Sequence, residues 1–360
     1  MEHFFKKKNT LSIILFIIIL ISFFVGFFLN ENAAGGGPLD FGHEWKNHLL
    51  LKQDIWSFLY NHNYYQSHLP TFAILLIKVF TFINSPFDFR LSVFICGLIL
   101  IILFYLNLKK QFSERGNWLP YLILNLLILS PYFRTSSFWG LQENLAYIFF
   151  LIVFYLDSFV NIRFKPYIVL LFSILCFYAD QKFFFVSIIY YFKYLNYEKV
   201  LSVRNFAISI FSFILIIPSL IIFYYWRGPV PYWTIPETFI FARFSFNING
   251  IFNAFQILTI YFFPILLIIN NYNLKNFFLK LLIPFNHYNY LYYFFIIISS
   301  VYIFFNEPNY NTGGGAIHKI YFLIKSKNLN LALLFYITCS FFSIAIVAAL
   351  LANLKKNIYI

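Results

Sequence analysis

Two acidic residues stand close together in the polar stretch between the first two hydrophobic segments of the chain. Asp40 and Glu44 follow three consecutive glycines, Gly35 to Gly37, in a loop too long to be a simple turn. Carboxylates are scarce, because only 13 of the 360 residues are Asp or Glu. Asp40 is therefore a candidate general base or metal-holding carboxylate, with Glu44 as its partner. An Asp before a helical stretch is also a good helix N-cap, so that structural role stays open.

Further charged residues form a second set of candidates. Glu143 begins a predicted helix, where its charge suits the helix N-terminus or pairs with nearby Arg134. Lys182 lies beside Asp180 in a polar break between two apolar runs. These two residues are compatible with a simple ion pair, but Lys182 is also suited to bind a phosphate as a point charge.

Other polar motifs give weaker signals. The glycines at 313–315 precede His318 and Lys319, and their backbone N–H groups could bind an anion, although the Walker spacing is lacking. Four histidines share the first polar loop at a spacing that fits no zinc site, which favours solvated or capping roles: His43, His48, His62 and His68. The cysteines all lie inside apolar runs and are expected to be packing residues: Cys96, Cys176 and Cys339.

The composition excludes a water-soluble domain. Hydrophobic residues make up 61% of the chain, charged residues 11%, and the mean hydropathy is +0.75. So little charge could not cover a soluble surface. The formal net charge of +13 would suit nucleic-acid binding by a soluble protein, but here Lys and Arg mark the cytoplasmic loops of a membrane protein. We therefore expect no nucleic-acid partner. Because the apolar runs are continuous rather than alternating, they predict transmembrane helices and not a barrel.

The placement of basic residues decides the topology. The span Leu11–Leu29 enters from the basic N-terminal side, so residues 31–69 form the first external loop, with an amphipathic interfacial helix over Trp45–Tyr60. The apolar segment Pro70–Ile83 has about fourteen residues, where a crossing needs about twenty. If this segment lies at the interface, the later basic clusters become cytoplasmic, so we adopt that assignment: Lys109, Lys110, Arg115, Arg163, Lys165, Lys193, Lys199 and Arg204.

The remaining segments complete an all-α, multi-pass protein with about ten crossings. We expect one membrane domain over residues 1–360, late crossings over 255–269, 290–305 and 329–351, and further external loops at 130–144, 227–250 and 307–328. This topology gathers ionisable side chains on the outer face, which is the predicted working face: Asp40, Glu44, Arg134, Glu143, Asp180, Lys182, Arg227, Glu237, Arg243, His318 and Lys319.

The order of these motifs resembles the GT-C superfamily of membrane glycosyltransferases, especially its protein mannosyltransferase and aminoarabinose transferase branch. In that family an acidic motif opens the first external loop, an amphipathic helix follows, and a Pro motif starts a second interfacial helix. The resemblance covers the first half of the chain, although Phe41 replaces the second acid and His68 stands near the position of a phosphate-contacting Lys. The matching positions are Asp40, the helix Trp45–Tyr60, Pro70, Arg90, Ser130, Pro131, Glu143 and Lys182.

The resemblance implies transfer of a sugar from a polyprenyl-phosphate donor to a hydroxyl acceptor, a lipid or a glycan, at the outer face of a bacterial inner membrane. Asp40 would be the base that deprotonates the acceptor. Glu143 would assist by orienting the acceptor or by holding a divalent cation, Mg or Mn, together with Asp40. The implied substrate-binding residues, which would neutralise the leaving phosphate or contact the substrate, are Arg134, Lys182, His68, His318 and Lys319. Direct displacement would invert the anomeric carbon.

Two other classes of function remain open. A flippase or transporter of lipid-linked sugars would need ionisable residues at mid-depth, for which only Lys78, Asp157 and Asp180 are candidates. An O-antigen polymerase or ligase also uses a polyprenyl-linked donor, but normally has its large functional loop late in the chain. Here the first external loop is the long one, which favours the glycosyltransferase.

Overall fold

The computed structural model describes residues 2–64, 68–79, 83–112, 118–140, 143–195, 202–234 and 315–339. Every regular element within these ranges is a helix, which confirms the predicted all-α class for this part of the chain. The chain divides into two compact units, Met1–Arg243 and Phe244–Ile360. The single membrane domain over residues 1–360 stays a prediction.

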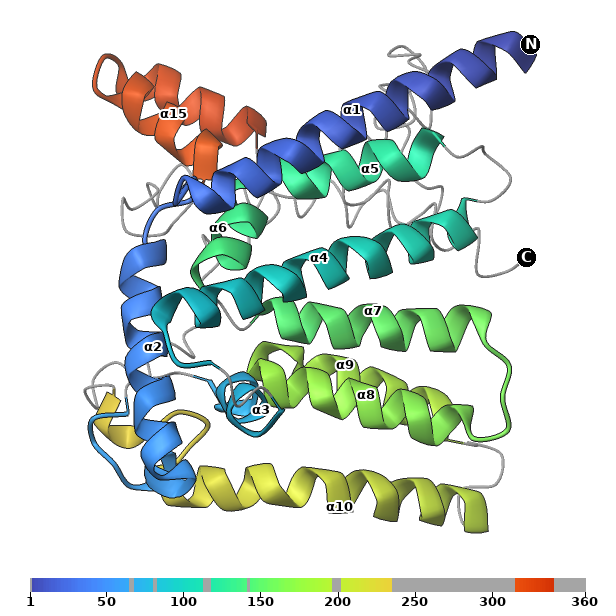
Figure 1. Cartoon of the computed structure of the whole chain (residues 1–360), viewed down its shortest axis with the longest axis vertical. Helices are drawn as coiled ribbons and strands as arrows, with labels where there is room; N and C mark the ends of the chain where they lie inside the picture. The colour runs from blue at the N-terminus through green and yellow to red at the C-terminus, as the bar shows by residue number, and fades with distance from the viewer. Residues whose placement is uncertain are drawn as a thin grey trace. The chain divides into compact units, whose positions relative to one another are not determined.

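The first unit contains most of the described helices. They are α1 (Glu2–Phe28), α2 (Gly37–Gln53), η1 (Ile55–Leu59), α3 (Thr71–Val79), α4 (Pro86–Gln111), α5 (Trp118–Leu129), α6 (Pro131–Trp139), α7 (Glu143–Phe159), α8 (Lys165–Ala179), η3 (Gln181–Phe183), α9 (Phe184–Tyr194), α10 (Val203–Trp226) and η4 (Tyr232–Thr234). The long helices α1, α4, α7, α8 and α10 run side by side, and α2 lies across their ends (Figure 1).

Three described helices are long and apolar enough to cross a membrane: Thr10–Phe28 within α1, α4 and α10. A fourth crossing is reached if the bent pair α6 and α7 counts as one span. These helices indicate a membrane protein. The predicted total of about ten crossings is not shown. The late crossings at 255–269 and 290–305 lie outside the described residues, whereas α5 and α8 are apolar but have only 12 and 15 residues.

The amphipathic helix of the first polar loop begins earlier and ends earlier than predicted. It starts at Gly37 rather than at Trp45, because Gly36 adopts a left-handed φ of 77° and Pro38 occupies the first turn, where its missing N–H costs nothing. It ends before Asp54, whose carboxylate accepts a hydrogen bond from the Trp56 backbone N–H at 3.0 Å and caps η1. The predicted single helix is therefore two helices.

Two further segments test the predicted topology. The helix α3 has 9 residues, too short to cross a membrane, which agrees with an interfacial segment. Residues 130–144, expected to be an external loop, contain the helix α6 and are therefore not an irregular loop, whereas their external location stays a prediction. Ser130 caps that helix by accepting from the Phe133 N–H, Pro131 occupies its first turn, and Gly140 ends it with a φ of 92°.

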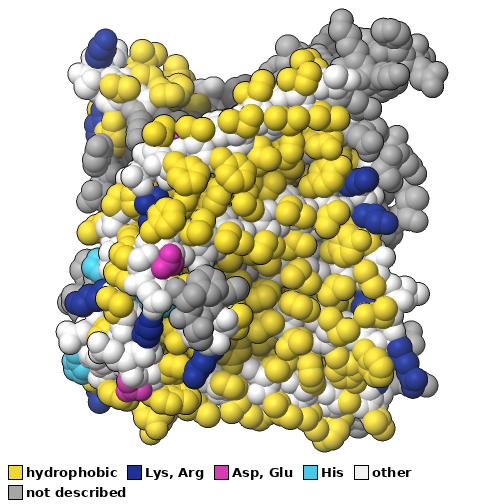
Figure 2. All heavy atoms as spheres, in the orientation of Figure 1, with side chains coloured by type: hydrophobic (Ala, Val, Ile, Leu, Met, Phe, Trp, Pro, Cys, Tyr) yellow, Lys and Arg dark blue, Asp and Glu magenta, His cyan; other side chains and the backbone are white. Residues whose placement is uncertain are grey.

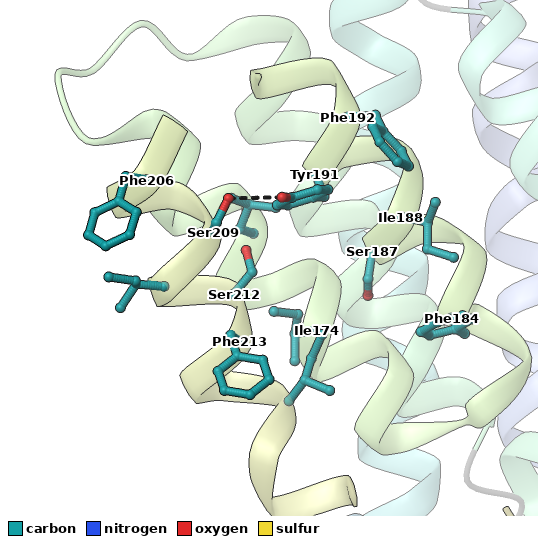
Figure 3. A pocket seen from close by; sticks show the side chains of 13 residues that line it. Ile174, Phe184, Ser187, Ile188, Tyr191, Phe192, Phe206, Ser209, Ser212 and Phe213 are labelled. Carbon is teal, nitrogen blue, oxygen red and sulfur yellow. Dashed lines mark hydrogen bonds between the residues drawn. The ribbon is translucent and has the colours of Figure 1, made fainter. Parts of the chain in front are cut away.

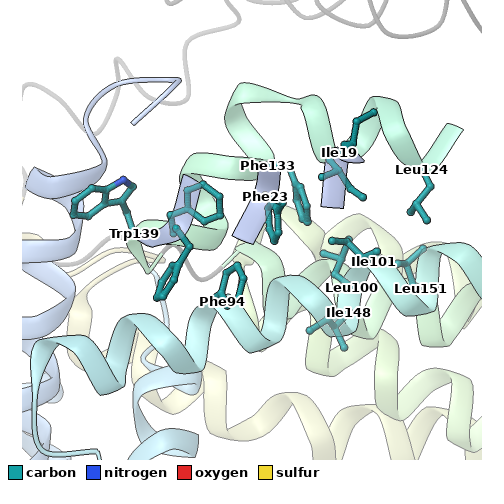
Figure 4. Close-up of a cluster of buried hydrophobic side chains, with 13 residues drawn as sticks. Ile19, Phe23, Phe94, Leu100, Ile101, Leu124, Phe133, Trp139, Ile148 and Leu151 are labelled. Carbon is teal, nitrogen blue, oxygen red and sulfur yellow. The ribbon is translucent and has the colours of Figure 1, made fainter. Parts of the chain in front are cut away.

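A cluster of buried apolar side chains joins α1, α4, α5, α6 and α7 (Figure 4). At its centre the Phe23 ring of α1 stacks against Phe94 of α4 and Phe133 of α6, with ring centroids 5.3 and 5.6 Å apart. Aromatic pairs at this separation attract each other beyond their burial. The contact fixes the end of α1 against α6, the helix that leads to Glu143.

Acidic side chains lie mainly at one end of the helices, whereas Lys and Arg lie at both ends. Hydrophobic side chains cover the middle of one face, and Lys and Arg lie toward its edges (Figure 2). At the end that α2 crosses lie the carboxylates of Glu31, Asp40, Glu44, Asp54, Asp88, Glu143 and Asp180. At the opposite end lie Lys109, Lys110, Asp157, Arg163, Lys165, Lys193 and Arg204. Among the described residues the acids therefore gather at the α2 end.

In the second unit, the structure describes α15 (Gly315–Lys325) and an apolar helix over Leu329–Cys339. The Tyr321 and Tyr336 rings pack together between them, with centroids 5.3 Å apart. The rest of the predicted loop 307–328 before Gly315, and the rest of the crossing 329–351 after Cys339, lie outside the described residues.

Candidate functional site

Asp40 lies in the first turn of α2 and leaves its carboxylate exposed. It does not cap this helix, because Gly36 occupies the N-cap position. Close packing holds the turn in place, since a Cβ added to Gly37 would lie 2.5 Å from Cδ1 of Trp139 at the end of α6. Partial desolvation raises the pKa of Asp40, the negative charge of Glu143 raises it further, and His43 opposes both. Asp40 therefore feels the charge of Glu143, as the predicted pairing requires.

Glu143 and Lys182 lie in direct contact. The Lys182 Nζ is 3.5 Å from Glu143 Oε1 at the start of α7 and 3.5 Å from Asp180 Oδ2 at the end of α8. The Asp180 side chain is 1% exposed, whereas Lys182 is 68% exposed. Burial lowers the pKa of Lys182, but the negative charges of Asp180 and Glu143 outweigh it and raise that pKa overall. Lys182 thus stays cationic while its ammonium group remains open to a ligand.

His68, just before α3, completes this group. Its Nδ1 lies 3.2 Å from Gln181 Oε1 and 3.6 Å from Asp180 Oδ1. We call Asp40, His68, Glu143, Asp180 and Lys182 the polar cluster. Four of these residues were predicted as site residues from the sequence, and the structure brings them together from four separate segments. Asp180 was predicted as a partner of Lys182, as an outer-face residue and as a candidate of the transporter alternative, but not as a site residue of the glycosyltransferase. Its position next to Lys182 was the signal that could have identified it.

Arg134 belongs to a different contact. Its guanidinium forms an ion pair with Glu31 and donates to the Ser22 carbonyl at 2.9 Å, and the side chain is buried. It also lies over the ring of Phe138 at 5.5 Å from the centroid. The structure therefore places Arg134 between α1 and α6. Its described contacts are with these two helices and with Glu31, and not with the polar cluster.

Removing the partner of this arginine is expected to destabilise the first unit. The Glu31→Gln variant leaves a buried guanidinium without its countercharge, which costs about 3 kcal/mol, at the lower end for buried pairs because Glu31 is 30% exposed. Thermal unfolding of the purified chain in detergent should show the loss as a lower Tm. The double variant Glu31→Gln with Arg134→Met should recover part of it. If the double variant loses more stability than the two single variants lose together, Glu31 and Arg134 do not stabilise the unit as an ion pair.

The other predicted site residues lie elsewhere. Glu44 is buried on α2, and its charge adds to the desolvation that raises the pKa of Tyr64. It therefore faces the η1 side of α2. His318 and Lys319 belong to α15 in the second unit, and the surroundings of their side chains lie outside the described residues. Gly313 and Gly314 also lie outside them.

The histidines of the first polar loop differ from one another. His48 was expected to be solvated or capping, but it is buried on α2 between the rings of Trp45 and Phe89. Desolvation, with the nearby charge of Lys52, lowers the pKa of His48 to about 4. His62 is exposed and stacks on Trp233 at 5.0 Å between ring centroids.

The predicted divalent cation has no ready-made site in the described part of the chain. Within those residues, no group of three or more His, Cys, Asp or Glu side chains could hold a metal ion. Asp40 and Glu143 are the two predicted ligands, and oxygen ligands suit Mg or Mn. Such an ion would have to complete its shell with substrate oxygens and water. A role for it stays a prediction.

A pocket of about 640 Å³ opens between α8, α9 and α10 (Figure 3). Apolar side chains form most of its wall. The lining residues Tyr191 and Ser209 form a hydrogen bond of 2.9 Å between Oη and Oγ. None of its described lining residues is charged. The pocket therefore offers no group for acid–base chemistry, which leaves the polar cluster as the candidate site.

Comparison with known proteins identifies no relative: no family model, no curated protein and no solved structure matches the chain. A functional assignment therefore rests on the residues and the geometry given above.

Proposed function

We propose that the chain is a membrane glycosyltransferase that moves a sugar from a polyprenyl-phosphate donor to a hydroxyl acceptor, a lipid or a glycan. The observation that carries this proposal is the contact of Lys182 with Glu143, whose charge also acts on Asp40. Lys182 Nζ lies 3.5 Å from Glu143 Oε1, and the charge of Glu143 raises the pKa of Asp40. A carboxylate base beside an exposed cation is the pair of groups that displacement of a phosphate by a hydroxyl requires.

Each member of the polar cluster has a role in this reaction. Asp40 takes the proton of the acceptor hydroxyl as the acceptor oxygen attacks the anomeric carbon. The bond from that carbon to the phosphate oxygen breaks, and the electron pair leaves with the polyprenyl phosphate. Lys182 neutralises the developing negative charge. Glu143 holds the Lys182 ammonium and, through its negative charge, raises the pKa of Asp40. Direct displacement inverts the anomeric carbon.

The α2 end of the first unit faces outward in this proposal. The basic residues at the opposite helix ends, such as Lys109 and Arg163, then lie on the cytoplasmic side, as the positive-inside rule requires. Polyprenyl-linked donors are membrane lipids, so the polar cluster would meet the donor at the surface of the bilayer. The bacterial inner membrane is the corresponding location.

The transporter alternative is less well supported by the positions of its candidate residues. Lys78 lies in the last turn of α3, and Asp180 lies at the C-terminal cap of α8. Asp157 lies near the end of α7, where its carboxylate accepts from Lys193 Nζ at 2.5 Å and from Tyr194 Oη at 2.7 Å. None of these three lies in the middle of a described helix. A transport path would need ionisable groups there.

The acid side of the pH–rate profile tests the pairing of the two acids. Only the deprotonated Asp40 accepts a proton, so kcat/KM should fall as the pH drops through the pKa of Asp40. Glu143→Gln removes a charge that raises this pKa, so the acid limb should move to lower pH, together with a lower maximal rate. Sugar transfer by the purified chain in lipid vesicles measures both effects, and Asp54→Asn serves as a control that should leave the limb in place. If the acid limb of the pH–rate profile does not move in Glu143→Gln, the charge of Glu143 does not act on Asp40.

A further inference from the structure

The side-chain amide of Gln181, next to the polar cluster, has only one possible orientation. Gln181 Nε2 lies 3.2 Å from the carbonyl oxygen of Pro229, after α10. A carbonyl oxygen can only accept a hydrogen bond, so the amide nitrogen must face it and donate. Gln181 Oε1 therefore faces the other way, toward His68 Nδ1 at 3.2 Å.

This orientation determines the tautomer of His68. Because Gln181 Oε1 can only accept, the hydrogen bond to it requires a proton on Nδ1 of His68. The carboxylate oxygen Oδ1 of buried Asp180, 3.6 Å from the same nitrogen, favours the same proton position. Neutral imidazole carries one proton, so Nε2 is left bare. Among the described residues Nε2 has no hydrogen-bond partner, and the side chain is 20% exposed.

We infer that Gln181 and Asp180 hold His68 as the Nδ1–H tautomer, so that His68 presents a hydrogen-bond acceptor to the substrate and not a cation to its phosphate. A bare Nε2 accepts a hydrogen bond from a hydroxyl, and in the proposed function, on which this part rests, the donor sugar carries hydroxyl groups and is attached to the phosphate that Lys182 binds. Lys182 then recognises the phosphate, and His68 recognises a hydroxyl of the sugar attached to it. Gln181 is a positioning residue that acts through His68.

Solid-state NMR of the full chain, with ¹⁵N-labelled histidine and in lipid bilayers at neutral pH, tests the tautomer without any transfer assay. The His68 signals are identified by their loss in His68→Gln. We expect one protonated nitrogen, Nδ1, and one bare nitrogen, Nε2, and we expect Gln181→Ala to populate the other tautomer. A proton on Nε2, or on both nitrogens, would overturn the inference.

The same samples test the ligand. Adding a polyprenyl-phosphate hexose should shift the Nε2 signal, whereas polyprenyl phosphate without a sugar should not. A shift of equal size with both lipids would make His68 a phosphate contact and overturn its role. If the tautomer is as expected and the Nε2 shift requires the sugar, but the wild-type chain transfers none, the inference holds and the proposed function fails.

Kinetics of matched variants also distinguish a hydrogen-bond acceptor from a cation at position 68. His68→Gln keeps an acceptor near the position of Nε2 and should retain most of kcat/KM, whereas His68→Lys keeps only a cation and should lose about tenfold, the value of one hydrogen bond. His62→Gln, at an exposed histidine that stacks on Trp233, is the control and should match the wild type. Higher activity of His68→Lys than of His68→Gln would contradict the inference.

Discussion

Asp40→Asn is expected to lower the rate of sugar transfer by about 10²–10⁴-fold, the usual contribution of a positioned general base. Asparagine has nearly the shape of aspartate but cannot take the acceptor proton. The Asp40 carboxylate is exposed and does not cap α2, so the variant should accumulate in membranes and unfold at the same temperature as the wild type. Transfer from a polyprenyl-phosphate sugar to an added acceptor, followed in membranes matched for protein content, measures the loss.

Asp54→Asn is the matched control for this substitution. Asp54 lies at the other end of α2, where it caps η1 and accepts a hydrogen bond from Tyr60. Asparagine caps helices about as well as aspartate, so stability and transfer should both be unchanged. Wild-type transfer by Asp40→Asn, or an equal loss in Asp54→Asn, would remove Asp40 from the role of base.

Lys182→Ala is expected to lower transfer by about 10²–10³-fold, as the removal of one group that stabilises developing negative charge typically does. The Asp180 carboxylate keeps its hydrogen bond from the Lys182 backbone N–H at 3.0 Å but loses the ammonium 3.5 Å away, so some loss of stability is expected and rates are compared at equal content of folded protein. Lys182→Arg keeps the charge and should retain a larger share of the activity. Single-turnover measurements with a saturating donor separate the loss in the chemical step from a loss in donor binding.

Lys46→Ala is the control for this lysine. Lys46 is an exposed residue on α2, outside the polar cluster, and its loss should leave the rate unchanged. If Lys182→Ala weakens donor binding but leaves the single-turnover rate at saturation unchanged, Lys182 binds the phosphate without stabilising its departure. If both Lys182→Ala and Glu143→Gln turn over normally, the reaction takes place somewhere other than the polar cluster.

The sequence predicted much of the local structure because its signals are local. Apolar length and the basic N-terminus identified α1, and the short segment at Pro70–Ile83 is α3, a helix too short to cross a membrane. The errors also have local causes. Pro38 and Ser130 are helix-start signals that the prediction did not use, so α2 was expected to begin at Trp45 and α6 was expected to be a loop.

Long-range contacts are the part that the sequence could not supply. Nothing in the spacing of Glu31 and Arg134 indicates that they form an ion pair, because residues far apart in the chain meet only through the packing of α1 on α6. The same is true of Asp180 and His68, which lie 3.6 Å apart. Charge placement assigned Asp40, Glu143 and Lys182 to one end of the helices, and the structure places Lys182 against Glu143. That the three share a site stays a prediction.

Reconstitution of the purified full chain in lipid vesicles, with a defined polyprenyl-phosphate sugar and a soluble hydroxyl acceptor, tests the proposed reaction most directly. Our account predicts that one polyprenyl phosphate is released for each sugar joined to the acceptor, with inverted anomeric configuration, and that Asp40→Asn slows the formation of both products by about 10²–10⁴-fold. Movement of the intact lipid-linked sugar across the bilayer without cleavage, at the same rate in the wild type and in Asp40→Asn, would contradict it.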